Sequence, residues 1–380
     1  MSDDFLAGLG EEPIVAKRNE LADEFGYPVG YNFAFAGFGQ CGGRIVNTFT
    51  KLGYRRVCAV NTTPQDMDGL HDAVAKLDIG RSLGAGKDPE RAAAVAADKD
   101  EDIFDLYKRA WGSDVDYAFV CLSAGGGTGA GAFVKGVEVA RRYMTSIGKP
   151  PRVGVIVALP KDSEGQRPAL NATHTFQKLH ELRPLSPVLF IDNQQFCTLF
   201  ANIPLLTEKD RSNVTTAGIL HAFNRVSGMR NADIGGPTFD RADFSRLLDS
   251  GLIAFAAHQA KSWDSASDLS TPIRERLKSN CLASVDISHG NVAGLLYGLG
   301  GTAQATLTVE QFEHATSAMT RLMSRADGTS TVYQGVFPVD GDGLQIMAMV
   351  GGLPWPKGRI EAFLRTSGAN RDALAALLDV

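Results

Sequence analysis

The sequence predicts an α/β protein in which a doubly wound parallel-sheet domain is joined by a long central helix to a smaller α+β domain. Short apolar runs that do not alternate with polar residues recur over residues 31–205, as in strands buried on both faces of a parallel sheet. Amphipathic stretches separate these runs, and strand–helix–strand repetition is typical of doubly wound domains. After residue 250 the pattern changes to strands mixed with helices.

Five apolar runs give the expected strands of the first domain, which is expected to span residues 31–208. The runs are YNFAFAGFGQ (31–40), YRRVCAVNTTP (54–64), VDYAFVCLSAGGG (115–127), PRVGVIVALP (151–160) and PLSPVLFIDN (184–193). Helices are expected over 43–53 and 133–144, where apolar residues recur at helical spacing.

The central helix is expected over 209–229, with Asp210 or Ser212 as its cap and Gly228 as its end. The smaller domain then spans 230–352. Its expected strands lie in 281–298, 331–339 and 344–352, with a helix in 308–324. Residues 1–30 form an N-terminal extension, and 353–380 form a C-terminal tail with one or two short helices after a proline-marked break.

Composition excludes several classes of protein. The net charge of −5 argues against a dominant nucleic-acid surface, which needs a basic field. No apolar run approaches the ~18–20 residues that cross a bilayer, and the acidic start lacks the pattern of a signal peptide. The five cysteines are scattered without a CxxC pair, which indicates reduced thiols in a cytoplasm rather than a metal site.

A glycine cluster follows the third expected strand. Five glycines occupy the seven positions 125–131, with Thr128 among them. Glycine lets a backbone approach a ligand closely, and the N–H groups at a helix N-terminus favour an anion. The cluster therefore predicts a phosphate cradle, and the alternative is a tight structural turn. It is not a Walker A loop, because Lys135 lies four residues after the last glycine.

Two further glycine elements lie on the same side of the predicted sheet. Residues 37–43 contain GxGxxG, and SLGAGKDPE occupies 82–90. A dinucleotide site expects an acidic residue about 20 positions after its glycines, but Asn61 lies 22 residues past Gly39. A Rossmann-type NAD oxidoreductase is therefore weakened as an alternative but stays open. Loops at the carboxyl ends of neighbouring strands could together surround a triphosphate.

These motifs resemble those of the tubulin/FtsZ superfamily, in the family's own order and over about residues 31–350. GGGTGAG resembles the tubulin signature, and GQCGG (39–43) resembles the first tubulin phosphate loop. The other matching segments are AVNTTPQDM (59–67), LGAGKDPE (83–90), FIDN (190–193), the long helix with Asn213, and TFDRADF (238–244).

The resemblance implies a GTP-binding domain whose subunits polymerise head to tail, with GTP or GDP and Mg²⁺ as cofactors. It implies these nucleotide contacts: Gly39, Gln40, Cys41, Gly42, Asn61, Gly84, Ala85, Gly86, Ala124, Gly125, Gly126, Gly127, Thr128, Gly129, Glu164, Arg167, Asn193 and Asn213. Asn193 and Asn213 match asparagines that contact guanine, and Glu164 matches a ribose contact. The family arginine lies four residues after this glutamate, where this chain has Pro168, and Arg167 lies three after it.

The resemblance assigns Asp240 and Asp243 to catalysis, on a loop that completes the GTPase site of the next subunit. The alternative is helix capping, since Asp is common at an N-cap. Asn193 has an alternative as an ordinary loop residue and Asn213 as a solvent-facing one. Cys41 is expected to be a small packing residue rather than a reactive thiol.

The implied role is cell division, cell shape or DNA segregation by a cytoplasmic filament. The implied partner is a second copy of the chain, with an adaptor or membrane-anchor protein possible and no direct nucleic-acid contact. An alternative is a nucleotide-binding regulator that neither polymerises alone nor hydrolyses GTP.

Overall fold

The computed structural model describes residues 28–80, 84–199, 211–229, 237–260, 262–323, 330–370, 372 and 375–378. Two compact units form. The large unit consists of Tyr31–Ala217 and Trp355–Val380, and the small unit contains Gly218–Pro354 and residues 28–30. The expected extension therefore lies outside the described residues, except for residues 28–30, and the expected cap Asp210 lies outside them too.

The large unit contains a parallel sheet in the order β3-β2-β1-β4-β5-β6. Its strands are β1 (Phe33–Phe38), β2 (Val57–Asn61), β3 (Ala75–Asp78), β4 (Tyr117–Ser123), β5 (Val153–Leu159) and β6 (Val188–Asp192). The predicted α/β class is confirmed, and so are the five expected strands. The strand order reverses between β1 and β4, and doubly wound sheets bind ligands beside such a reversal.

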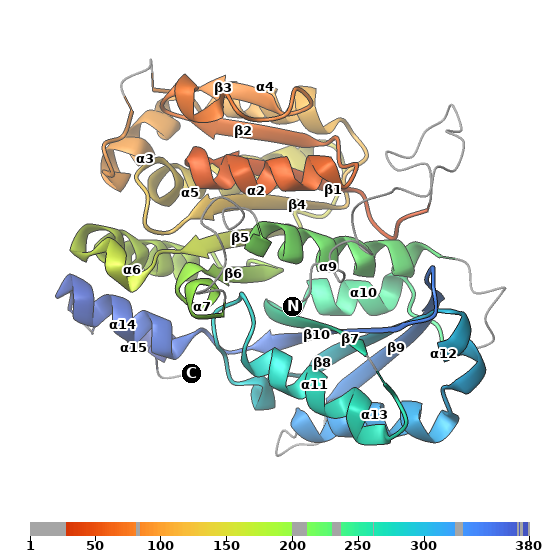
Figure 1. Ribbon diagram of the computed structural model, residues 1–380. Coiled ribbons are helices and arrows are strands. Elements are labelled where there is room, and N and C mark those ends of the chain that lie inside the picture. The colour runs from red at the N-terminus through yellow and green to blue at the C-terminus, as the bar shows by residue number, and fades with distance from the viewer. Residues whose placement is uncertain are drawn as a thin grey trace. The chain divides into compact units, whose positions relative to one another are not determined.

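The helices of the large unit connect these strands or follow them along the chain (Figure 1). They are α2 (Gly39–Lys51), α3 (Pro89–Asp98), α4 (Asp100–Trp111), α5 (Thr128–Ser146), α6 (Gln166–Glu181), α7 (Asn193–Leu199), α14 (Lys357–Ser367) and α15 (Ala375–Leu378), with 3₁₀ turns η1 (Pro64–Met67) and η2 (Asp162–Glu164). Asp88 caps α3 by accepting from the N–H groups of Glu90 and Arg91, with Pro89 at the first helical position.

An aromatic cluster fills the core beside β1. Phe35 stacks on Phe49 with ring centroids 3.9 Å apart, and on Phe119 at 5.1 Å. All three side chains are fully buried. Aromatic residues bury large apolar areas, so this cluster holds β1, β4 and α2 together beneath the loops that follow both strands.

The helix α9 (Arg211–Gly228) runs from residues of the large unit into residues of the small unit. It ends at Gly228, as the sequence predicts. Ser212 lies inside α9 with a helical backbone, so it is not the N-cap that was expected. An N-cap residue has non-helical backbone angles.

The described residues of the small unit form four strands in the order β7-β10-β8-β9. They are β7 (Leu252–Ala260), β8 (Val292–Leu299), β9 (Thr331–Pro338) and β10 (Leu344–Leu353), with α10 (Arg241–Leu248), α11 (Ala266–Lys278), η4 (Ile287–His289), α12 (Gly301–Thr306) and α13 (Val309–Leu322). β10 pairs antiparallel with β7 and β8, and β8 pairs parallel with β9. The helix α10 lies on one side of this sheet, and α11 and α13 pack together on the other (Figure 1).

The expected strand 281–298 is correct only in its second half. Asp286 accepts from the N–H of Ser288 and caps the turn η4, so the chain becomes extended only from Val292. The strand β7 was not expected, although LIAFAA within it is an apolar run.

Candidate functional site

The glycine cluster forms the connection between β4 and α5. Ala124 donates its N–H to the carbonyl of Ala158 at 2.9 Å, which fixes the start of the connection to β5. Thr128 is then the first residue of α5, and Gly127 before it has no side chain to cap the helix. The first-turn N–H groups of a helix have no partner within the helix, so this end of α5 can bind an anion.

Two side chains of α6 hydrogen-bond to carbonyl oxygens of the cluster and of the residues beside it. The Nδ2 of Asn171 donates to the carbonyl oxygens of Gly125 (3.3 Å), Gly126 (3.0 Å) and Lys87 (3.1 Å). The hydroxyl of Thr175 donates to the carbonyl of Ala124 at 3.2 Å. Phosphate oxygens accept hydrogen bonds, so the N–H groups of the connection, and not the carbonyl oxygens that α6 holds, are the backbone groups that can bind a phosphate.

The glycines of the cluster differ in what surrounds them. A Cβ on Gly127 would lie 2.8 Å from the Cα of Lys87 and 2.9 Å from the amide nitrogen of Asp88, so the fold itself requires glycine there. A Cβ on Gly126 would meet only the carbonyl oxygen of Ser123, at 3.9 Å. The φ angle of Gly126 is not positive either. Neither packing nor backbone conformation explains Gly126, whereas close approach of a ligand would.

The first glycine loop lies against this cluster. Gly39 begins α2 with φ +72°, and a Cβ there would lie 3.0 Å from the amide nitrogen of Gly129. The structure thus brings the two predicted phosphate loops together. The expected start of α2 at residue 43 is four residues late, because Gly42 is in the helix and packs on the carbonyl of Cys121.

The residues around Gly39 make specific polar contacts. Asp66 accepts from the Nε2 of Gln40 at 3.2 Å and from the Nδ2 of Asn61 at 3.4 Å. The Oδ1 of Asn61 in turn accepts from the N–H of Thr62 at 2.8 Å. Burial raises the pKa of Cys41 to about 11, against the opposing effect of Arg44. Its thiol is therefore protonated at neutral pH, as expected for a packing residue.

The loop of residues 84–88 is the third glycine element, and it lies beside the other two. The hydroxyls of Thr62 and Thr128 share a hydrogen bond of 2.8 Å, and the carbonyl of Thr62 accepts from the N–H of Gly84 at 3.1 Å. Ala85 is buried and Gly86 is exposed with φ +59°. Lys87 has a positive φ of 59°, which is uncommon for a side chain other than glycine.

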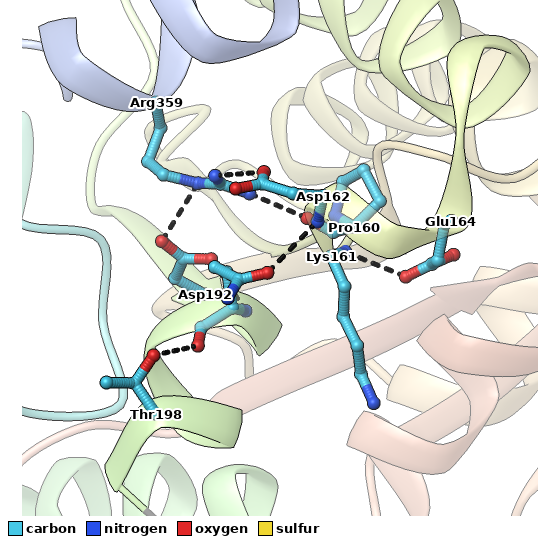
Figure 2. A network of polar contacts seen from close by, with 8 residues as sticks. Pro160, Lys161, Asp162, Glu164, Asp192, Thr198 and Arg359 are labelled. Atoms are coloured by element: carbon cyan, nitrogen blue, oxygen red, sulfur yellow. Dashed lines mark hydrogen bonds and ion pairs between the residues drawn. The ribbon is translucent and has the colours of Figure 1, made fainter. Parts of the chain in front are cut away.

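Arg167 lies beside this third loop. Its Nε donates to the carbonyl of Lys87 at 3.2 Å, so the structure shows it supporting the loop of residues 84–88. Glu164 lies in η2, where its Oε1 accepts from the N–H of Lys161 at 2.8 Å (Figure 2). Asn193 is the first residue of α7 and is half-buried. Asn213 is 7% exposed on α9, which excludes the alternative that it faces solvent.

The sequence did not single out several polar residues that shape this site. Asn171 and Thr175 are four residues apart on α6, so they share one helix face. The signal available in the sequence was two polar residues at helical spacing. Thr62 follows β2 directly, and Asp66 lies in the next turn, η1. Arg359 comes from α14, and no motif in the sequence connects it to this part of the fold.

Asp240 and Asp243 belong to the small unit and form a reciprocal cap at the start of α10. The N–H of Asp243 donates to the Oδ1 of Asp240 at 3.0 Å, and the N–H of Asp240 donates to the Oδ2 of Asp243 at 3.2 Å. Burial raises the pKa of Asp243, and the negative charge of Asp240 adds to this effect. The capping role that the sequence allowed is thus present.

The described residues contain no group of three or more His, Cys, Asp or Glu side chains that could hold a metal. Mg²⁺ is usually held by one or two carboxylates together with substrate phosphates rather than by a protein cage, and Asp66 is an acidic side chain that contacts Gln40 of the first glycine loop and Asn61 at the end of β2. Within the same residues, no helix is long and apolar enough to span a membrane.

Comparison with known families agrees with this geometry. Residues 32–200 match the model of the Tubulin/FtsZ family, GTPase domain. A tubulin-like protein CetZ of Thermococcus kodakarensis is 27% identical over 345 residues, covering 87% of this chain and 84% of the relative. A cell division protein FtsZ 1 of Pyrococcus furiosus is 30% identical over 175 residues, covering 44% and 43%.

Solved structures show the same fold over nearly the whole chain. The protofilament of Bacillus thuringiensis serovar israelensis TubZ in its GTPγS form has a TM-score of 0.74 at 18% identity, covering 90% of this chain and 92% of that one. The GTPγS-bound protofilament of CetZ2 from Haloferax volcanii has a TM-score of 0.71 at 21% identity, covering 91% and 99%.

Proposed function

This chain belongs to the tubulin/FtsZ superfamily, and on that premise we propose that it is a GTPase that assembles head to tail into filaments. GTP binds in the large unit, and the acidic loop 238–243 of one subunit completes the hydrolytic site of the next. Structures of two similar proteins are described as GTPγS-form protofilaments, which supports nucleotide binding and head-to-tail assembly in this proposal.

The single observation that carries nucleotide binding is the convergence of three glycine loops beside the β1–β4 reversal. Gly39 contacts Gly129, and Gly127 contacts Lys87. Backbone N–H groups of 39–42 and 125–129 would hold the phosphates, with Thr128 adding a hydroxyl. Glu164 would contact the ribose, and Asn193 and Asn213 the guanine.

Hydrolysis needs charge neutralisation and a positioned water more than covalent chemistry. Mg²⁺ bound with the nucleotide supplies positive charge on the phosphates. Asp240 and Asp243 are the residues that would orient the attacking water across the subunit contact. Because each carboxylate has two oxygens, a cap that uses one oxygen of each leaves another to accept from water.

The test is the rate of GTP hydrolysis per subunit against protein concentration, with Mg²⁺ present and light scattering recorded in parallel. A rate that rises above a critical concentration together with scattering would support an active site shared between subunits. A low, constant rate without scattering would contradict assembly-dependent hydrolysis. A monomer under GTP at every concentration in size exclusion and pelleting would contradict polymerisation.

The second candidate is a regulator that binds GTP without turning it over, and the reciprocal cap of Asp240 and Asp243 favours it. An Asp240→Ala variant with unchanged turnover would support this alternative. The NAD oxidoreductase has less support, since the position of the expected acidic residue holds Asn61, which is buried. A saturable titration with NAD that GTP does not displace would revive it.

The expected process is cell division, cell shape or DNA segregation by a cytoplasmic filament. The expected partner is a second copy of the chain, and an adaptor or membrane-anchor protein could join it. Relatives named CetZ, TubZ and FtsZ do not distinguish these roles for this chain.

A further inference from the structure

Arg359 of α14 makes three polar contacts on the large unit (Figure 2). Its Nη1 lies 2.6 Å from the Oδ1 of Asp162, and its Nη2 donates to the carbonyl of Pro160 at 2.7 Å. Its Nε lies 3.0 Å from the Oδ2 of Asp192. The side chain of Arg359 is 10% exposed, so these contacts are made largely away from water.

The three acceptors lie on two different turns. Pro160 follows β5, and Asp162 begins η2, the turn that also contains Glu164. Asp192 ends β6, and the next residue, Asn193, begins α7. One guanidinium therefore joins the turn that carries the proposed ribose contact to the turn that carries a proposed guanine contact.

A hydrogen bond that does not involve Arg359 also joins these two turns. The N–H of Asp162 donates to the Oε1 of Gln194 at 3.1 Å. Glu164 is held within its own turn by the N–H of Lys161. The two turns thus form one hydrogen-bonded assembly, in which Arg359 is the only charged group that contacts both among the residues drawn in Figure 2.

Asp192 shows why a cation is needed here. Its side chain is fully buried, and burial raises its pKa while the charge of Arg359 opposes the rise. The Nε and Oδ2 atoms are not aligned as a hydrogen bond, so the pair depends on charge. Removing one partner of a buried pair leaves an uncompensated charge, which is strongly destabilising.

The shape of arginine suits this position. A guanidinium presents donors in a rigid planar fork, whereas a lysine ammonium is a compact charge on a flexible stem. The guanidinium of Arg359 also lies over the ring of Phe363, 4.5 Å from its centroid. This contact fixes the plane of the fork against its own helix.

We propose that Arg359 is a positioning residue for the nucleoside end of the nucleotide: it holds the turns of Glu164 and Asn193 at the spacing that the ribose and guanine require. The inference rests on the proposed GTP binding. Arg359 does not contact the nucleotide itself, and the last segment of the large unit is therefore part of the binding site's frame.

The test compares the affinities of GDP and IDP, since IDP lacks the 2-amino group of guanine. Isothermal titration is run on the wild type, Arg359→Lys, Asp162→Asn and Arg365→Lys. Arg365 is exposed on the same helix, so it is the matched control. Asp162 has a side chain that is 54% exposed, so Asp162→Asn removes the negative charge of one partner, while keeping an oxygen acceptor, with little risk to folding.

Because a lysine cannot make all three contacts of the guanidinium, we expect Arg359→Lys to bind GDP about tenfold more weakly, a misplacement cost of the kind that distant supporting groups show, with a smaller loss for IDP. The GDP:IDP preference should therefore fall. Asp162→Asn should show the same trend more weakly, and Arg365→Lys should match the wild type. Gly126→Ala, at the phosphate end, should weaken both nucleotides equally.

Three outcomes would contradict a proposal, and they distinguish a failure of the proposed GTP binding from a failure of the role of Arg359. A wild type that binds neither nucleotide would overturn the proposed function. A wild type that binds GDP, with unchanged affinity and preference in Arg359→Lys and Asp162→Asn, would overturn the role of Arg359 alone. Equal losses for GDP and IDP with a lowered Tm in Arg359→Lys, and no effect of Asp162→Asn, would show a structural role only.

Discussion

At the scale of single residues, Gly126 and Gly127 are neighbours with opposite constraints. The backbone of Lys87 and Asp88 leaves no space for a Cβ on Gly127, whereas Gly126 has only the carbonyl of Ser123 nearby. The sequence pattern treats both glycines alike, and only the packing around each separates a folding requirement from a binding requirement.

We therefore predict that Gly126→Ala keeps the Tm of the wild type, or raises it slightly because an alanine restricts the unfolded chain, and binds GDP at least about tenfold more weakly. Thermal unfolding and titration with GDP measure the two quantities. Gly127→Ala serves as the contrast and should lower the Tm. Unchanged GDP affinity in Gly126→Ala would argue against phosphate binding at this loop.

His221 is a second residue whose environment has a measurable consequence. Burial, with a smaller contribution from the charge of Arg225, lowers its pKa to about 4. In the unfolded chain the imidazole of His221 gains a proton near pH 6.5, whereas in the folded chain it stays neutral at that pH. The stabilisation is thus fully present above pH 6.5 and is lost as the pH falls from 6.5 toward 4, by up to about 3 kcal/mol.

The corresponding prediction compares urea unfolding of the wild type and His221→Asn at pH 7.5, 5.5 and 4.5. The free energy of unfolding should fall less steeply with pH in the variant, because it has no proton to gain at this position. Parallel pH profiles for the two proteins would mean that His221 does not contribute to acid sensitivity.

At the scale of elements, α10 begins with two carboxylates that serve each other as caps. Replacing Asp243 by alanine removes one cap and costs about 1 kcal/mol of stability, whether or not the residue is catalytic. Stability alone cannot therefore separate the two roles of this helix start.

We predict that Asp243→Asn keeps its side-chain oxygen as a capping acceptor, retains GDP binding and stability, and loses most of its GTP turnover. The measurements are steady-state phosphate release, titration with GDP and thermal unfolding. Exposed Asp249 is at the other end of α10, and Asp249→Asn is the control for the loss of one charge. Wild-type turnover in Asp243→Asn would leave capping as the role of this residue.

Much of the large unit could be predicted at this scale. Its five central strands are continuous apolar runs, and burial on both faces requires that pattern. The edge strand β3 was missed because AKLD is short and only partly buried. Contacts between distant segments, such as Asn171 to Gly126 or Arg359 to Asp192, could not be predicted from the sequence. The residues around each partner determine its own local structure, but they do not indicate which distant residue it will contact.

At the scale of the whole molecule, a site shared between subunits allows two inactive proteins to restore each other. Gly126→Ala should bind nucleotide only weakly at its own loops but still present Asp243. Asp243→Asn should bind nucleotide but lack the catalytic carboxylate. In a head-to-tail filament each variant supplies what its neighbour lacks.

We accordingly predict that an equimolar mixture of these two variants hydrolyses GTP well above the sum of the separate rates at the same total concentration. Phosphate release against mixing ratio is the measurement, and the rate should peak near equal amounts. The control is a mixture in which a double variant, carrying both Gly126→Ala and Asp243→Asn, replaces one of the two single variants. Strictly additive rates would indicate a site completed within one subunit.

The large unit is discontinuous along the chain, with α14 and its Arg359 separated from β6 by all of the small unit. During synthesis the ribosome must therefore translate roughly 170 further residues, from Asp192 to Arg359, before the buried carboxylate of Asp192 can meet its cation, a delay on the order of ten seconds. Until then the nascent chain carries an unfinished nucleotide site. Newly made subunits would thus complete this site only after α14 has been synthesised and has docked onto the earlier part of the large unit.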